Sequence, residues 1–356
     1  MFVGEERRRG RGARTNTSGR FERQSYEAFD DGWEIEGDLP PFKTVVHTDN
    51  ARSVITRNDS PDISFDQSIN PYRGCEHGCI YCYARPTHCY LGHSAGLDFE
   101  SQLYAKPDAA ELLRKELARP GYRPRTIALG TNTDPYQPIE REQKITRGVL
   151  EVLEETKHPL GIVTKSVLIV RDIDILARMA KQGLVKVALS VTTLDRKLAR
   201  SMEPRASTAA KRLEALRALG EAGVPTAVMV APIIPGLNDH EIERILEAAA
   251  NVGVQEAGYV MLRLPLEVKD LFREWLETDH PGKAKKVIKL VQSLHGGLDY
   301  RSEFGVRQRG SGPYADQIAA RFRLAMKACG LNVHREQLRT DLFEKPVLKG
   351  GQMRLF

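Results

Sequence analysis

The sequence lacks the long apolar runs that a membrane-spanning segment requires. Nowhere in its 356 residues does an uninterrupted apolar stretch reach the roughly 18 residues needed to cross a bilayer. Its start, Met-Phe-Val-Gly-Glu-Glu, is acidic and then rich in arginine, without the apolar segment of a secretory signal. We therefore expect a cytoplasmic protein that has no membrane partner.

Cysteine is also scarce. The chain has five cysteines, and three of them fall within eight residues. Such a distribution is unsuited to a disulfide framework in a chain of this length, and it favours a metal site in a reducing compartment.

Positive charge is in excess, but unevenly. Residues 1–24 hold seven arginines and three glutamates, a net +4 of the chain's +6. A segment so polar cannot bury enough apolar surface to fold. The composition predicts a disordered basic arm over residues 1–40, either as a solvated tail or as an arm that contacts nucleic-acid phosphates.

Short apolar runs alternate with helical periods between residues 65 and 265, a pattern typical of βα units around a parallel sheet. We expect a short strand before the cysteines and further strands at Thr126–Gly130, Gly161–Lys165, Val185–Ser190, Thr226–Val230 and Gly258–Leu262. Six units are too few for a closed eight-unit barrel. The sequence therefore predicts an α/β fold, a partial (β/α)6 TIM-type barrel with active-site groups where the strands end.

The pattern turns helical beyond residue 265. Helices are expected at Glu267–Thr278, Gly282–His295 and Pro313–Gly330. This divides the chain into the basic arm at 1–40, the barrel at 41–265, a C-terminal helical region at 266–345 and a tail at 346–356.

The three clustered cysteines, Cys75, Cys79 and Cys82, lie on one predicted loop. Gly74 and Gly78 allow the backbone of that loop to wrap a cofactor closely. Three thiolates leave a fourth position free, and an iron with an open position can bind a substrate.

Other metal sites are compatible with the same cysteines. A zinc ion could be completed by His77, His88 or Cys89. A conventional electron-transfer cluster could take Cys89 or Cys329 as its fourth ligand.

The CxxxCxxC spacing, with Tyr81 just before the third cysteine, resembles the radical SAM superfamily. The longer pattern Asn-Pro-Tyr-Arg-Gly before Cys75, together with Cys82-Tyr83, resembles its spore photoproduct lyase branch. The resemblance covers about residues 65–265 and implies an enzyme. It further implies a [4Fe-4S] cluster on the three cysteines and reductive cleavage of S-adenosylmethionine (SAM) to a 5′-deoxyadenosyl radical. An electron donor of the flavodoxin or ferredoxin type would supply the reductant.

The resemblance also assigns residues that follow the strands. It places SAM recognition at Thr131, Asn132 and Asp134, with Lys165 facing the SAM carboxylate and Ser190 in the same pocket. Ordinary strand-end turn contacts are the alternative for the hydroxyl groups among them.

Four further residues are candidates. Glu203 could bind the ribose hydroxyls and Arg205 a carboxylate, although an internal ion pair or a helix-start role suits both equally. Tyr81 and Tyr83 match tyrosines of the lyase branch and could form a catalytic relay, with packing as the alternative.

The substrate stays open at this stage. The lyase uses a cysteine hydrogen donor on its second strand, where this chain reads Ile-Ala-Leu-Gly from Ile127. One hypothesis is a DNA repair-like radical SAM enzyme acting on nucleic acid, supported by the basic arm and by Arg301, Arg307 and Arg309. The other is a radical SAM enzyme or cluster-bearing accessory protein that acts on a protein or a small molecule.

The last residues of the chain suggest a partner. Gln352, Leu355 and Phe356 follow a glycine spacer and resemble the pentapeptide that docks on the bacterial DNA sliding clamp. Packing of the two apolar residues on the protein's own helices is the alternative.

Overall fold

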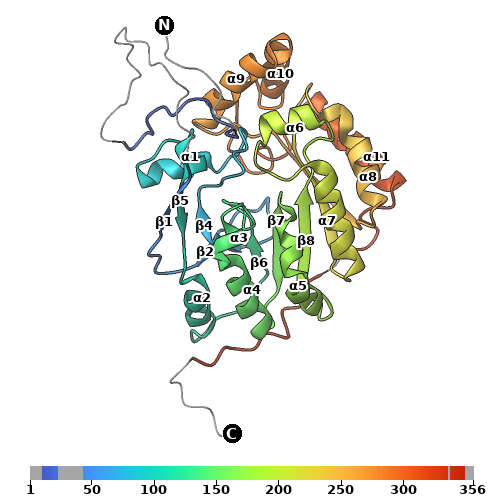
Figure 1. The fold of residues 1–356 in the computed structure, drawn as a ribbon. Coiled ribbons are helices and arrows are strands. Elements are labelled where there is room, and N and C mark those ends of the chain that lie inside the picture. The colour runs from blue at the N-terminus through green and yellow to red at the C-terminus, as the bar shows by residue number, and fades with distance from the viewer. Residues whose placement is uncertain (1–9, 23–42, 336, 349–356) are drawn as a thin grey trace.

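The main sheet of the computed structural model is an open, largely parallel barrel (Figure 1). The structure describes residues 10–22, 43–335 and 337–348. Within these residues the sheet has the order β10-β9-β8-β7-β6-β3-β2. Its strands are β2 (Ile55–Arg57), β3 (Gln67–Ile69), β6 (Ile127–Leu129), β7 (Leu160–Thr164), β8 (Val185–Ser190), β9 (Thr226–Ile233) and β10 (Glu256–Met261). Six are parallel and β2 is an antiparallel edge, which confirms the predicted partial (β/α)6 barrel.

Amphipathic helices cover the outer face of this sheet (Figure 1). They include α2 (Ala109–Leu117), α3 (Glu140–Gln143), α4 (Ile145–Glu155), α5 (Ile173–Ala180), α7 (Ala209–Glu221) and α8 (Ile242–Ala250), with the 3-10 turns η2 (Val167–Asp172) and η3 (Asp239–Glu241). In α8, for example, Ile242, Ile245, Leu246 and Ala249 recur at helical spacing and are buried. The core therefore forms between the strands and one apolar stripe of each helix.

A small second sheet leads into the cysteine loop. It has the order β1-β5-β4, from β1 (Val45–Thr48), β5 (Gln102–Ala105) and β4 (Tyr72–Arg73), with η1 (Arg85–Leu91) and α1 (Asp98–Ser101) beside it. Because β4 ends one residue before Gly74, this sheet fixes the point from which the loop departs.

The helices beyond the barrel are α9 (Val268–Asp279), α10 (Pro281–Ser293) and α11 (Pro313–Ala328). With α6 (Arg196–Met202), α9 and α10 share a second apolar cluster with the cysteine loop, and Figure 1 shows them at the end of the barrel toward which the strand arrows point. The helical region ends earlier than the predicted residue 345. The chain from Arg339 to Glu344 instead forms backbone hydrogen bonds to Gly183 and Thr156, at the other end. In the described part of the chain, no helix has the length and apolar character of a membrane span.

Residues 10–22, named here the N-terminal strap, differ from the predicted disordered arm. The backbone N–H groups of Gly12 and Ala13 donate to the Glu100 carboxylate at 2.9 and 2.8 Å. Arg11 is 3% exposed, and Arg14 pairs with Asp279 at 3.1 Å. The strap is ordered because its charges have partners far along the chain, which composition alone does not reveal. The rest of the predicted arm and the clamp-type peptide at 352–356 lie outside the described residues.

Candidate active site

The cysteine loop winds tightly at two glycines. At Gly74, with φ of 77°, an added Cβ would lie 2.7 Å from the Leu103 side chain. At Gly78, with φ of 64°, it would lie 2.6 Å from the Glu100 carboxylate. Both positions need glycine because a side chain has neither the conformation nor the space.

This loop opens into a cavity of about 340 Å³ at the carboxyl ends of the strands. Most of the residues expected at the site line it: Cys75, Cys79, Cys82, Tyr81, Tyr83, Thr131, Asn132, Asp134, Lys165 and Ser190. Their convergence follows from the parallel sheet, whose strands all end at this side. The volume suits a small molecule, since such sites begin at about 300 Å³.

The three thiols are separate donors at one wall of the cavity. Burial raises the pKa of Cys79 to about 12 and the pKa of Cys75 well above its usual range. Within the described residues, no three His, Cys, Asp or Glu side chains converge as a single metal ion requires. A [4Fe-4S] cluster binds each thiolate through a different iron and needs no such convergence. The donor set therefore fits a cluster better than a zinc ion.

The other proposed ligands lie elsewhere, with one exception. Cys89 is buried outside the cavity lining, with its sulfur near Gly19 of the strap. Cys329 packs against the main core at the end of α11. His88 stacks on His93, again away from the cavity. His77 does line the cavity, but its Nδ1 lies 3.3 Å from the Asp134 carboxylate. None of the alternative fourth ligands is thus presented to the cavity without a partner.

Lys165 brings a positive charge to the cavity. It follows β7, and its Nζ lies 5.7 Å from the centre of the Tyr81 ring. In the part of the chain that the structure describes, no carboxylate forms an ion pair with this Nζ. Since Ser190 lines the same wall from the end of β8, a bound carboxylate would meet both an ammonium and a hydroxyl group here.

Asp134 ties three segments of the site together. Its carboxylate accepts hydrogen bonds from Thr164 Oγ1 at 2.6 Å and from the backbone N–H of Lys165 at 2.8 Å. Burial alone would raise the pKa of Asp134, but His77 and these hydrogen bonds outweigh it and lower the pKa to about 2. Asp134 is therefore ionised and fixed, and it holds the cysteine loop against the end of β7.

Asn70 is the first residue of the sequence motif that precedes Cys75, but no role was predicted for it. Its Oδ1 accepts from Thr131 Oγ1 at 3.1 Å and from the backbone N–H of Asn132 at 2.9 Å. It thereby sets the course of the polar loop after β6. Its position at the end of β3, next to the cysteine motif, is the sequence signal that could have identified it as a site residue.

Glu203 differs from the prediction that it binds a ribose. Its carboxylate is 3% exposed and accepts hydrogen bonds from Arg212, Tyr81 and Thr192. Burial would raise the pKa of Glu203, but Arg212 and then Lys165 outweigh that effect and lower the pKa to about 2. Neither Glu203 nor Arg212 lines the cavity. In the structure, Glu203 forms a buried ion pair with Arg212 and holds the Tyr81 hydroxyl.

Arg205 is also engaged within the protein. Its guanidinium pairs with Glu76 at 3.1 Å, and its backbone N–H donates to the His77 carbonyl at 3.3 Å. It supports the cysteine loop from outside the cavity lining, and its guanidinium already has a carboxylate partner in Glu76. Of the two alternatives that the sequence left open for Glu203 and Arg205, the ion pair is the one formed.

The two tyrosines of the loop have different surroundings. The hydroxyl of Tyr81 is held by Glu203, whereas Tyr83 is 42% exposed and donates to the Thr131 carbonyl. Arg263, which the sequence analysis did not identify, lies over the Tyr83 ring at 4.6 Å. With Phe65, these residues form an aromatic and cationic side of the cavity.

Of the three arginines singled out near the C-terminus, two are ion-paired within the protein and the third packs on an aromatic ring. Arg301 pairs with Glu303, and Arg307 with Asp62. Arg309 lies over the Tyr259 ring at 4.0 Å. They are poorly placed to serve as free phosphate contacts.

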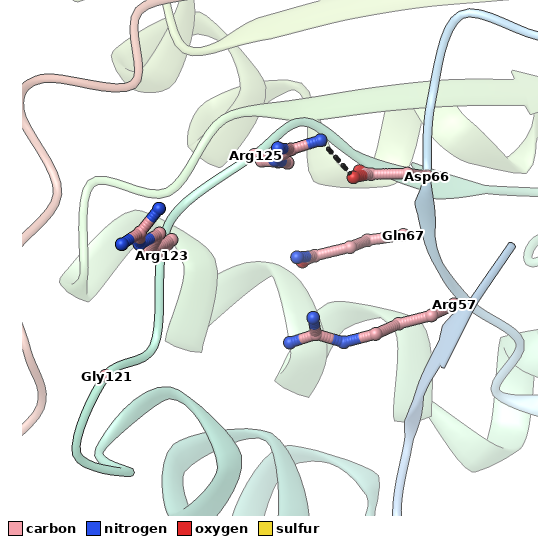
Figure 2. Close-up of a pocket in the computed structure, with 6 residues that line it drawn as sticks. All are labelled: Arg57, Asp66, Gln67, Gly121, Arg123 and Arg125. Atoms are coloured by element: carbon pink, nitrogen blue, oxygen red, sulfur yellow. Dashed lines mark hydrogen bonds and ion pairs between the residues drawn. The ribbon is translucent and has the colours of Figure 1, made fainter. Parts of the chain in front are cut away.

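A second hollow, of about 230 Å³, lies at the other end of the strands (Figure 2). Arg57 and Gln67 reach from β2 and β3 toward the loop that carries Arg123 and Arg125, and Arg125 pairs with Asp66. No cysteine and none of the candidate SAM residues lines it. The chemistry therefore belongs to the cavity at the carboxyl ends.

Comparison with known proteins matches the part of the chain that carries most of the cavity lining. The family model described as the radical SAM superfamily matches residues 69–249, just over half of the chain. An uncharacterised protein from Mycobacterium tuberculosis is 39% identical over 232 residues, 65% of this chain and 68% of that protein. An uncharacterised protein from Methanocaldococcus jannaschii is 30% identical over 173 residues, 49% of this chain and 62% of that protein.

The fold is similar to solved structures of spore photoproduct lyase. Its complex with a dinucleoside spore photoproduct matches with a TM-score of 0.57 over 85% of this chain and 86% of that chain. A lyase variant with bound AdoMet and the same dinucleoside matches with a TM-score of 0.56 over 81% and 80%. Both are 18% identical to this sequence, so the likeness concerns the fold.

The loop and the family model point to one cofactor set. Members of this superfamily bind a [4Fe-4S] cluster and SAM. Cys75, Cys79 and Cys82 are suited to hold the cluster, because all three thiols face one cavity that also has room for a small molecule. The matched residues include this loop and the strands β6 to β9, and the chain belongs to the radical SAM superfamily.

Proposed function

We propose that this radical SAM enzyme acts on a nucleic acid and removes a hydrogen atom from a nucleotide that enters the cavity. The carrying observation is the side of the cavity formed by Phe65, Tyr83 and Arg263. Aromatic rings offer a stacking surface for a base, and a guanidinium offers a fork for a phosphate. The similar fold of spore photoproduct lyase, solved with a dinucleoside photoproduct, supports the same substrate class.

Within this proposal the residues divide into three roles. Cys75, Cys79 and Cys82 hold the cluster, and Thr131, Asn132, Asp134, Lys165 and Ser190 surround SAM. When bound, the cluster and SAM supply a reductive cleavage whose radical product takes a hydrogen atom from the substrate. Superfamily enzymes need a reductant, and we propose a flavodoxin or a ferredoxin in that role. Of the two tyrosines, Tyr83 is the better relay candidate because its ring is exposed, whereas Tyr81 is buried with its hydroxyl on the Glu203 carboxylate.

The proposed substrate is not spore photoproduct itself. Among the described residues, the thiols that line the cavity are those of the three loop cysteines. On β6, the strand on which the lyase carries its cysteine, the residue that lines the cavity in this chain is Ala128. The hydrogen donor that the lyase resemblance implies is thus missing. A different nucleotide lesion or modification is the substrate that fits.

The test of this function is isotope transfer. We expect deuterium to appear in 5′-deoxyadenosine when the reconstituted holoenzyme, SAM and dithionite are incubated anaerobically with deuterated DNA or RNA. Mass spectrometry of the released 5′-deoxyadenosine gives the result. Deuterium arriving from a labelled peptide or metabolite mixture, and never from nucleic acid, would establish the protein or small-molecule alternative.

Lys165→Ala is expected to weaken SAM binding while the cluster remains. A charge-assisted contact to a carboxylate is worth roughly 1.5–3 kcal/mol, or about 10- to 150-fold in affinity. Anaerobic titration calorimetry measures the affinity, and iron and sulfide content checks the cluster. Lys186→Ala is the matched control, because Lys186 lies on the neighbouring β8 but pairs with Glu256. Equal SAM affinity in the two variants would remove Lys165 from the SAM site.

A further inference from the structure

Helix α10 carries charge of one sign only. Its thirteen residues include Lys283, Lys285, Lys286 and Lys289 and no acidic residue. All four lysines are exposed, on the arc opposite the buried residues of the helix. Apart from α6, every other α-helix of the described residues has at least one acidic side chain.

These lysines have no partners within the described chain. No hydrogen bond or ion pair there involves any of their four Nζ atoms, whereas Lys115, Lys157, Lys186 and Lys211 each pair with a glutamate. Their spacing also places like charges three and four residues apart, as at Lys285 and Lys289. Such pairs destabilise a helix on its own. An anion that binds several of them together would relieve the repulsion.

Helix α6 is also basic. It carries the exposed Arg196, Lys197 and Arg200 and no acidic residue within its bounds. Its N-cap residue Asp195 interacts electrostatically with His280, the N-cap residue of α10. The two helices also pack in one apolar cluster, and their basic residues are together called here the basic face.

The basic face is joined to the cysteine loop through a common apolar cluster. Leu198 and Met202 of α6 pack in one cluster with Val287 of α10 and with Ile80 of the loop. The backbone N–H of Ile80 also donates to the Met202 carbonyl at 3.0 Å. Figure 1 shows α6, α9 and α10 together at the end of the barrel where the strands terminate. The face thus lies at the same end of the barrel as the cavity, one layer of helices above the loop.

We propose that the basic face binds the backbone phosphates of the nucleic acid whose nucleotide enters the cavity, an inference that rests on the proposed function. The four ammonium groups of α10, which have no ion pair in the described chain, match a phosphate backbone and carry no base specificity. Among the described arginines expected to contact phosphates, Arg14 is bound by Asp279 and Arg307 by Asp62. The lysines of α10, in contrast, are exposed and grouped on one helix.

The experiment compares two triple variants of equal charge. Lys285→Gln/Lys286→Gln/Lys289→Gln removes the basic face, and Lys181→Gln/Lys327→Gln/Lys345→Gln removes three exposed lysines from other elements. Fluorescence anisotropy of the holoenzyme with a labelled DNA duplex is recorded over a series of salt concentrations. Each lost phosphate contact lowers the slope of log affinity against log salt by about 0.9, so we expect a loss of about 2.7 in the first variant and little change in the second.

The outcomes are separable from those of the proposed function. Equal slopes for the two variants, or no DNA binding by the unaltered protein, would overturn the basic face as a nucleic-acid surface. A basic-face variant that keeps its DNA affinity but loses binding to phosphatidylcholine–phosphatidylserine vesicles would also overturn it, because the face would then be a membrane surface. Release of 5′-deoxyadenosine from SAM by the dithionite-reduced holoenzyme without nucleic acid is measured in parallel and should be the same in all three proteins. Its absence in the unaltered protein would contradict the radical SAM activity, whatever the anisotropy shows.

Discussion

Replacing Cys75, Cys79 or Cys82 by alanine is expected to abolish both the [4Fe-4S] cluster and the cleavage of SAM. Each thiol faces the cavity from one short loop, and no other cysteine is placed to substitute for a lost ligand. A cluster held by two protein thiolates is exposed to loss in solution, so the expected effect is complete rather than graded. Iron and sulfide analysis after anaerobic reconstitution measures the first property, and 5′-deoxyadenosine release measures the second.

Cys89→Ala and Cys329→Ala are the matched controls. Both sulfurs lie outside the cavity lining, and both variants should keep the cluster and the activity. A Cys89→Ala protein that loses its cluster would contradict the open-iron arrangement, since it would make Cys89 a fourth ligand. Retention of a full cluster by any single variant of the loop would contradict the assignment of its three thiols.

Glu203→Ala is expected to lower the free energy of unfolding by about 3–5 kcal/mol, because it leaves Arg212 as an uncompensated buried charge. Arg212 is 2% exposed, so water cannot replace the lost carboxylate. Urea unfolding of the holoprotein under anaerobic conditions, followed by circular dichroism, measures the change. Glu214→Ala is the control on the same helix as Arg212: Glu214 pairs with Lys211 at the surface, where such a pair contributes about 0.2–1 kcal/mol.

The same ion pair predicts a pH dependence. The pKa of Glu203 is about 2 in the folded protein and 4.5 ordinarily. A lowered pKa stabilises the fold above the ordinary value, and this contribution is lost as the pH falls from about 4.5 toward 2. Glu203→Gln should therefore flatten the acid limb of the stability profile. An unchanged profile would show that Glu203 is not ionised in the folded state.

The sequence predicted the elements that depend on local pattern. The expected strand Val185–Ser190 has the same bounds as β8, because nearly all of its residues are buried, as in a central strand of a parallel sheet. The family resemblance assigned Lys165 and Ser190 to one site, and both line the cavity because parallel strands end at the same side of a sheet. The cysteine spacing was specific enough to identify the loop and its family.

Partners distant in sequence could not be predicted in this way. Glu203 and Arg205 follow a strand as site residues do, but Arg212 and Glu76 bind them away from the cavity. A long charged side chain can turn toward either side of its backbone, and only the tertiary structure shows which. The strap and the basic face could not be predicted for the same reason. In the strap, Arg14 was expected to be free and is paired with Asp279. In the basic face, the lysines of α10 had no predicted role and are unpaired within the described chain.

The N-terminal strap has a consequence for how the protein is made. Its backbone crosses the cysteine loop so closely that a Cβ on Gly12 would lie 1.8 Å from the Gly78 carbonyl oxygen. Yet the strap is held by Glu100, Glu274 and Asp279, which follow it by 87 to 265 residues. During synthesis from the N-terminus, this first segment therefore cannot settle until most of the chain has left the ribosome. The strap therefore closes over the cysteine loop only after the loop and most of the barrel have been made.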